Sequence, residues 1–346
     1  MRGLLPEAAL FVIYSRVAIK RFSSLFCVAF LACATSAAPG LIAPGVISTV
    51  DDEAGGALTP DGNDFYFAKF APYTTAPRLS LICVSHRHGA RWSEPQAVPF
   101  SGQYLDLPPR LSPDGKTLLF GSTRPIPGSD AHGIHLWQVT RTSSGWSAAQ
   151  PLPPAINAPG VSNLDASVAS DGTLYLTTDA GSANDFHISV SHLSSGQYSK
   201  PERLPAPVHS GPDNIDVEPF IAPDQSYLLF VSQWTGQDPR NKRPQELIAG
   251  GSPYPRGDIY ISYHKANGWT PPRHLENGIN SFAEEAYPTV TADGKSFIFS
   301  SERSSFNIPQ PHSITWAELE RKWHSILNGR GNIYRVPMSS VTGGSR

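Results

Sequence analysis

Short runs of alternating polar and apolar residues cover most of the chain, and tight-turn residues separate them. The stretch RLSPDGKTLLFGSTRP, residues 110–125, is typical. An apolar stripe leads into Pro-Asp-Gly at Asp114, and apolar residues then alternate at Leu118 and Phe120. Alternation with a period of two predicts a half-buried strand, while proline presets φ for a turn and glycine accepts positive φ. The stretch therefore predicts a β-hairpin.

This hairpin pattern occurs five times. Its turn aspartates recur at intervals of roughly 50 to 70 residues, a period typical of propeller blades and other repeat arrays. Glycine follows the aspartate in four copies, and Gln225 takes its place in the fourth. The five turn residues are Asp61, Asp114, Asp171, Asp224 and Asp293.

A second unit follows the first four hairpins. It consists of an alternating strand, a glycine turn, and a shorter strand that opens with an aromatic residue and contains proline, which suits a sheet edge. The aromatic residues are Trp92, Trp146, Tyr198 and Trp269. Hairpin and second unit give four strands a repeat, the size of a propeller blade. We therefore predict an all-β, five-bladed propeller of four-stranded antiparallel blades.

The last repeat lacks an outer strand of its own. After its hairpin the chain offers one further strand, in GNIYRVPMSS, which matches the GDIYIS segment of the fourth repeat. The N-terminal segment LIAPGVIS resembles AINAPGVS, residues 155–162, which ends one outer strand and leads into the next blade. We expect the N-terminal segment to complete the last blade, because this would cover an otherwise open sheet edge.

The repeated SPDGKxLxFxSxR pattern, with DIYIS and W(S/T)xP after it, resembles the WD-repeat-like propeller repeats of TolB-type proteins. The resemblance extends from Asp51 to Val336. It implies a propeller, for which six blades are the alternative to five, and it covers periplasmic partner-binding proteins as well as domains attached to peptidases. The chain has five repeats and no separate N-terminal α/β domain, so the resemblance does not extend to the cellular role of TolB itself.

Residues 1–38 have the pattern of a signal peptide. Basic residues precede the apolar run LFCVAFLACATSAA, which is too short to span a bilayer and ends in small residues. We expect cleavage near Ala37 or Ala38, a single propeller domain over 39–346, and a periplasmic or secreted location. Lipidation at Cys33 is the alternative, because FLAC partly matches a lipoprotein signal. Cys83, the one cysteine left after cleavage, has no partner for an internal disulfide.

The formal net charge of −2 gives no basic surface for a phosphate backbone, which argues against nucleic acid as a partner. We expect no membrane span in the mature chain, and we expect a monomer. The histidines and acids have no spacing typical of a metal centre, so the sequence predicts neither a metal nor another cofactor.

Strand order puts the inter-blade loops and the loops after each hairpin on one face of the propeller, and the Pro-Asp-Gly turns on the other. Four acids and an amide begin the inner strands on the first face: Glu53, Asp106, Asn163, Asp216 and Glu285. Paired carboxylates at a channel mouth could serve a glycoside hydrolase or polysaccharide lyase. An acid repeated in nearly every blade is explained more simply by bonds within the scaffold.

Arginines end two of the second strands, at Arg124 and Arg303, where they could tie loops together through salt bridges or contact a ligand. Two insertions, 234–257 and 304–331, break the repeat on the inter-blade face, and long loops on a rigid scaffold commonly bind partners. The first insertion combines aromatic and basic residues that could contact a sugar or an acidic partner: Trp234, Arg240, Tyr254 and Arg256.

The second insertion predicts a helix, with a capping box at Thr315 and Glu318 and a C-terminal stop at Asn328-Gly329. Its apolar stripe contains Trp316, Leu319, Trp323, Ile326 and Leu327. The stripe could pack the helix onto the propeller, or it could form a partner groove or channel lid. From these features we expect a binding module for an envelope or extracellular protein or glycan, with the hydrolase or lyase as the alternative.

Overall fold

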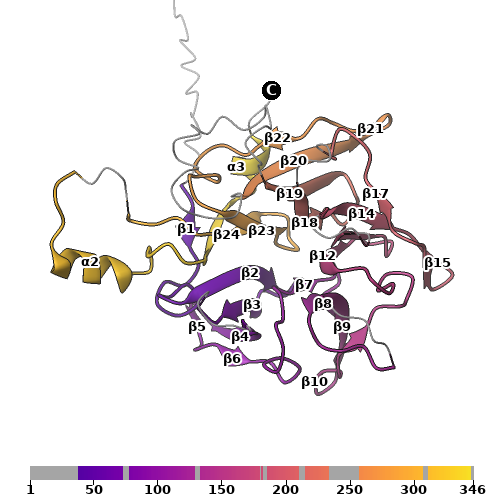
Figure 1. Ribbon diagram of the computed structural model, residues 1–346, viewed down its shortest axis with the longest axis horizontal. Helices are drawn as coiled ribbons and strands as arrows, with labels where there is room; N and C mark the ends of the chain where they lie inside the picture. The colour runs from indigo at the N-terminus through magenta and orange to yellow at the C-terminus, as the bar shows by residue number, and fades with distance from the viewer. Residues whose placement is uncertain are drawn as a thin grey trace, which may run out of the picture. The chain divides into compact units, whose positions relative to one another are not determined.

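The computed structural model describes residues 38–72, 78–128, 133–179, 181, 185–209, 215–233, 257–306 and 311–343. These residues lie in one compact unit, Ser36–Arg346, and fold into five antiparallel sheets placed in a ring (Figure 1). The five-bladed propeller expected from the repeats is therefore confirmed. The predicted signal peptide lies outside the described residues apart from Ala38, and so does most of the first insertion.

Each blade begins with its inner strand and continues outward along the chain. Blade one contains β2 (Asp52–Leu58), β3 (Asp64–Phe70), β4 (Ser80–His88), β5 (Arg91–Trp92) and β6 (Gln96–Ala97). Blade two contains β7 (Arg110–Leu111), β8 (Thr117–Ser122), β9 (His135–Thr142), β10 (Gly145–Trp146) and β11 (Gln150–Pro151). Blade three contains β12 (Asn163–Val168), β13 (Leu174–Thr178), β14 (His187–Ser191) and β17 (Glu202–Arg203), with a small hairpin of β15 (Leu193–Ser194) and β16 (Gln197–Tyr198) beside it.

Blade four contains β18 (Ile215–Ile221), β19 (Tyr227–Gln233), β20 (Gly257–Lys265), β21 (Gly268–Trp269) and β22 (Arg273–His274). Blade five contains β23 (Glu285–Val290), β24 (Ser296–Ser301) and β25 (Asn332–Pro337), and its outer strand is β1 (Gly40–Leu41). The pairing of Gly40 with Arg335 places the N-terminal segment at the edge of the last blade. The expected closure of the ring is confirmed.

The turn aspartates hold the hairpins through their carboxylates. In blade two, Asp114 Oδ1 accepts hydrogen bonds from Ser112 Oγ at 2.6 Å and from the Lys116 backbone N–H at 3.0 Å. These bonds lower the pKa of the Asp114 carboxyl, because they stabilise its charged form. Gln225, which replaces the glycine in blade four, has φ 59°, so the turn keeps its left-handed residue there without glycine.

The core consists of five apolar clusters, one between each pair of neighbouring blades. Phe120 of blade two packs with Tyr66 of blade one, and Phe230 of blade four packs with Tyr175 of blade three. Ile47 and Ile298 belong to the cluster that joins blades five and one. The ring order of the blades therefore follows the chain, and each blade is stabilised by burying apolar surface against its two neighbours.

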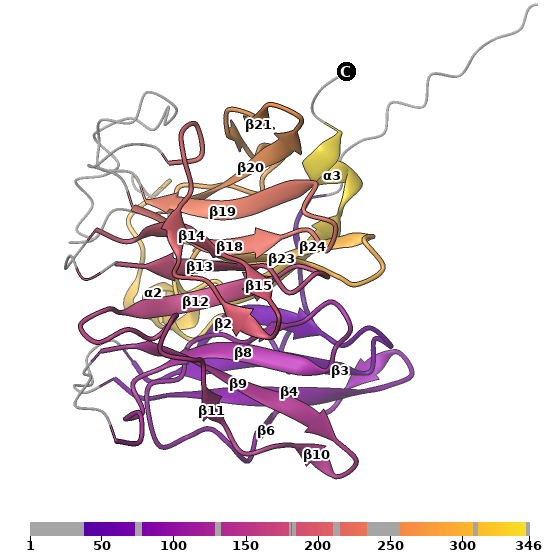
Figure 2. The same ribbon diagram turned by 90° about the vertical axis from the view of Figure 1, so that its right-hand side faces the viewer.

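Two helices lie at opposite faces of the propeller (Figure 2). Helix α2 (Trp316–Trp323) belongs to the inter-blade face, which carries the loops that enter and leave the inner strands. Helix α3 (Ser339–Thr342) follows β25 at the turn face, which carries the Pro-Asp-Gly turns. The sequence pattern does not predict α3.

Candidate functional site

The four carboxylates proposed from the sequence as channel-mouth catalysts are buried beside the inner strands. Glu53 lies in β2, Asp216 in β18 and Glu285 at the start of β23, while Asp106 pairs with Ser122 just before β7. Their carboxylate groups contact their own blade or its entering loop. Glu285 accepts from the Ser281 backbone N–H at 2.8 Å, and Asp106 accepts from Ser122 Oγ at 2.6 Å.

The arginines that end the second strands of blades two and five pair with two of these acids. Arg124 Nη2 lies 2.7 Å from Asp106 Oδ1, and Arg303 Nη2 lies 3.3 Å from Glu285 Oε1. Both guanidinium groups also donate to inter-blade carbonyls, Arg124 to Phe100 O at 3.0 Å and Arg303 to Ile279 O at 2.7 Å. The two arginines thus tie loops to blades, and Arg124 in addition lines a cavity of about 420 Å³ together with Tyr104 and Trp137.

Four further site candidates, Trp234, Arg240, Tyr254 and Arg256, lie outside the described residues. The other two, Trp316 and Trp323, lie on α2.

The capping box expected at the start of α2 is present, because Thr315 accepts from the Glu318 N–H and Glu318 accepts from the Thr315 N–H. The helix ends at Trp323 rather than near Asn328, so the predicted C-terminal stop was wrong by about one turn.

Helix α2 does not pack onto the propeller, contrary to one of the two expectations for its apolar stripe. None of its residues is buried, and it projects beyond the ring of blades (Figure 1). Trp316 is 64% exposed and Trp323 48% exposed, and their rings meet edge to face with centroids 5.6 Å apart. The helix therefore presents two tryptophans to solvent, an unusual placement for large apolar side chains.

Other exposed apolar residues lie on the same face. Leu327 follows α2, and the neighbouring Asn328 Nδ2 donates to Val50 O at 2.9 Å, which brings Val50 beside the end of the insertion. Phe282 and Leu79 are exposed in other loops of the inter-blade face. Among the described residues, seven large apolar side chains are exposed, and six belong to this face; the seventh is Leu193, in the β15–β16 hairpin.

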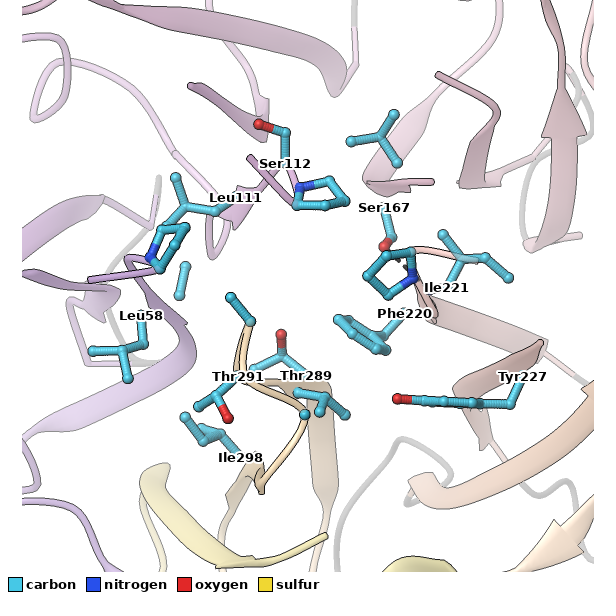
Figure 3. Close-up of a pocket in the computed structure, with 18 residues that line it drawn as sticks. Leu58, Leu111, Ser112, Ser167, Phe220, Ile221, Tyr227, Thr289, Thr291 and Ile298 are labelled. Atoms are coloured by element: carbon cyan, nitrogen blue, oxygen red, sulfur yellow. Dashed lines mark hydrogen bonds between the residues drawn. The ribbon is translucent and has the colours of Figure 1, made fainter. Parts of the chain in front are cut away.

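The channel along the propeller axis contains a cavity of about 120 Å³ on the turn-face side. All five blades contribute to its wall, and Figure 3 shows Leu111, Ser167, Phe220 and Thr289 around the open space. Most of the lining is apolar, with serine and threonine hydroxyls among the apolar groups. The insertions in the sequence predict a binding surface on the opposite face, and no sequence pattern predicts this cavity.

Three buried charged residues on the inner strands were likewise not predicted as site residues from the sequence. Arg110 belongs to β7, Asp165 to β12 and Glu218 to β18. Arg110 Nη2 lies 3.7 Å from Asp165 Oδ2, and Glu218 Oε2 accepts from the Tyr287 backbone N–H at 2.5 Å. The sequence did contain a signal for two of them. Asp165 lies two residues after Asn163, and Glu218 lies two residues after Asp216, so both acids occupy the same position relative to the polar residue that begins the inner strand.

Burial dominates the electrostatics of this cluster. It raises the pKa of Glu218 to about 8, with the neighbouring Asp165 carboxylate adding to the shift. Burial also raises the pKa of Asp165, against the opposing effect of the Arg110 guanidinium. At neutral pH, therefore, Glu218 is protonated and can act as an O–H donor.

No group of three or more histidine, cysteine, aspartate or glutamate side chains in the described ranges is arranged to hold a metal ion. Within those ranges, no helix has the length and apolar character needed to cross a membrane.

Fold and site together define the chain as a five-bladed β-propeller with exposed apolar side chains on its inter-blade face and a buried charged cluster on its inner strands. No protein-family model matches the chain, and no curated protein matches it in sequence. Among solved structures it is similar to the catalytic domain of a Coprinopsis cinerea GH62 alpha-L-arabinofuranosidase, with a TM-score of 0.47, 9% identity, and coverage of 88% of this chain and 97% of that one.

It is also similar to an oligogalacturonate lyase in complex with manganese, with a TM-score of 0.40, 13% identity, and coverage of 82% of this chain and 64% of the lyase. A Mycobacterium tuberculosis puromycin-hydrolyzing peptidase gives a TM-score of 0.38 and 13% identity, with coverage of 81% of this chain and 41% of the peptidase. The chain thus spans less than two thirds of the lyase and of the peptidase. At these identities the likeness concerns the fold alone.

Proposed function

We propose that the protein is an exported binding module whose inter-blade face binds a protein partner. The observation that carries the proposal is the exposure of Trp316 and Trp323 on a helix that stands off the propeller, with Leu327 and Val50 beside it. Burying a large apolar side chain contributes roughly 1.5–3 kcal/mol, so covering this patch would stabilise a complex substantially. Tryptophan is also enriched among the residues that dominate protein interfaces.

A protein partner fits the patch better than a glycan does. The exposed set on this face combines tryptophan and phenylalanine with aliphatic valine and leucine, and such an apolar centre is typical of protein interfaces. Charged groups at its edge, including Arg321 and Arg330, would supply a polar rim. The rigid propeller fixes where the insertion starts and ends, which limits the conformational entropy lost on binding.

The alternative, a hydrolase or lyase that uses Glu53, Asp106, Asp216 and Glu285, has less support. A general acid and a base need different environments and access to substrate. These carboxylates instead lie in similar, buried positions, three of them beside a lysine or arginine of their own blade.

Export rests on the signal-like pattern of residues 1–38, and we propose a periplasmic or secreted location on that basis. The repeated SPDGK pattern supports the further proposal that the blades are TolB-type, WD-repeat-like repeats. Neither proposal is needed for the inter-blade face to bind a partner.

Site-specific photo-crosslinking tests the proposed face. A photoreactive phenylalanine analogue is placed at Trp316, and in a matched variant at Leu193, the exposed apolar residue of the β15–β16 hairpin. Both variants are expressed in the native host and irradiated. We expect a defined protein adduct from position 316 and none from position 193. Equal labelling from both positions, or no adduct from position 316, would contradict the proposal.

A further inference from the structure

A groove of about 620 Å³ is lined by helix α2 and by the chain segments before and after it. Ile314 belongs to the segment before the helix, Arg321 and Lys322 to the helix, and Ile326 to the segment after it. The two isoleucines are partly buried, whereas Arg321 is exposed. Pockets that hold ligands in proteins have volumes of roughly 300–1,000 Å³, so this groove can accept side chains of a second molecule.

The groove and the two tryptophans of α2 lie on opposite sides of the helix. Trp316 and Trp323 are seven residues apart and therefore share one side, because seven residues make about two helical turns. Glu318, Arg321 and Lys322 are spaced by three and four residues and share another side. These three residues, and neither tryptophan, line the groove. The helix thus offers a polar surface in addition to its apolar one.

Two cations in the groove have no carboxylate partner within the described parts of the chain. Arg321 makes no ion pair there, although it lies on the same helix as several acids. Lys322 Nζ donates to the carbonyl oxygen of Ser305 at 2.5 Å, and an ammonium group has two further N–H donors. Both cations can therefore bind a carboxylate without breaking an existing ion pair.

Glu318, the one acid in the groove wall, does not neutralise these cations. Its Oε2 accepts from the Thr315 N–H at 2.7 Å, and its Oε1 lies 3.4 Å from His312 Nε2. The bond from the Thr315 backbone lowers the pKa of the Glu318 carboxyl, because it stabilises the charged form. With this acid charged and His312 neutral, Arg321 and Lys322 leave the groove with a net positive charge.

The groove is complementary to a carboxylate that has apolar groups beside it. An arginine can hold a carboxylate through two parallel bonds, and lysine adds a second positive charge. Ile314, Ile326 and Leu327 supply apolar contacts next to the cations. We propose that the groove binds an extended segment of the protein partner in which an aspartate or glutamate lies beside a large apolar residue. This inference rests on the proposed function, because it states the chemistry of the partner of that face.

A protein segment explains the arrangement better than an anionic bilayer does. A helix that binds at a bilayer surface places its apolar face among the acyl chains and its basic face away from them. With Trp316 and Trp323 in a bilayer, the groove on the other side of α2 would be left empty. A folded partner can cover the tryptophans and also extend a segment into the groove.

Selection of short random peptides from a display library on the purified, immobilised protein tests this proposal. We expect the recovered peptides to be enriched in aspartate or glutamate next to leucine, isoleucine, phenylalanine or tryptophan. Exchange of the acids for amides in the tightest peptide should weaken its binding by about tenfold, because a charge-assisted hydrogen bond is lost.

Arg321→Gln should weaken binding of the acidic peptide by a similar factor, about tenfold, and leave binding of the amide peptide unchanged. Arg330→Gln is the matched control. It removes the same charge from an exposed arginine on the same face but outside the groove, and it should bind the acidic peptide as the parent does. Both arginines are exposed, so both variants should fold.

Recovery of no peptide, recovery of peptides without acidic residues, or equal weakening by the two substitutions would overturn the groove proposal. Vesicles of phosphatidylglycerol that bind more tightly than any recovered peptide, and that depend on Arg321, would overturn it in favour of a membrane. Crosslinking from position 316 separates this result from the proposed function. A protein adduct without acidic peptides contradicts the groove proposal alone, whereas the lack of an adduct contradicts the proposed function.

Discussion

Glu218 is a titrating group at the centre of the propeller. It faces Asp165, Arg110 and Glu284, and burial with the charge of Asp165 raises its pKa from 4.5 to about 8. The folded chain therefore holds a proton that the unfolded chain releases above pH 4.5. Stability from this group is present below that pH, and it is lost as the pH rises toward 8.

The free energy of unfolding should consequently fall between pH 5 and pH 8, with a contribution from Glu218 of roughly 3–4 kcal/mol. Glu218→Gln cannot titrate and should flatten this dependence, whereas the exposed Glu94→Gln should leave it unchanged. Thermal melting at a series of pH values measures the slope. The same slope in Glu218→Gln as in the parent protein would argue against a protonated Glu218 in the folded state.

For single residues, the sequence predicted the contacts of the turn aspartates better than it predicted the contacts of residues in the channel. Each turn aspartate could be identified from Pro-Asp-Gly or a close variant, because its Oδ1 accepts from the backbone N–H two residues further along the chain. Arg110 reaches a carbonyl on blade five, and this contact depends on how the ring closes. No local pattern around Arg110 predicts which atoms lie across the channel.

Among the elements, β1 has the clearest stabilising role, since it completes blade five. Ile47 follows it and is fully buried in the cluster between blades five and one, while Ser48 Oγ donates to Ile333 O at 3.0 Å. Ile47→Ala should lower the free energy of unfolding by roughly 2–5 kcal/mol, because it leaves a cavity at the closure of the ring.

Chemical denaturation measures this change, and Val50→Ala, which truncates a 40%-exposed side chain, is the control. A small and equal effect of both substitutions would show that the N-terminal segment does not hold the ring closed. The role of this segment was predictable because LIAPGVIS matches an inter-blade segment elsewhere in the chain. The residue at which α2 ends was not predictable from the sequence. The Ser305 N–H donates to Leu327 O, and this bond between residues distant in sequence is incompatible with a helix that continues to Asn328.

At the scale of the whole molecule, the propeller presents two different surfaces. The inter-blade face has exposed apolar residues on and around α2, while the turn face opens into the channel cavity. The repeat pattern predicted the five blades because each blade contacts mainly its neighbours, so the local sequence determines most of the fold. The exposure of α2 could not be predicted, because an apolar stripe is equally compatible with packing onto the blades and with binding a partner.

Replacement of α2 tests most directly the claim that the inter-blade face binds a protein partner. The helix can be replaced without removing buried side chains, because none of its residues is buried. Residues 311–327 are exchanged for a short Gly/Ser linker, and the melting temperature is measured together with the affinity for the partner identified by crosslinking. We predict an unchanged melting temperature, because the blades keep all their shared clusters, and a loss of at least about tenfold in affinity. Unchanged affinity in the folded variant would contradict the account, as would a large drop in melting temperature, which would show that α2 is part of the scaffold.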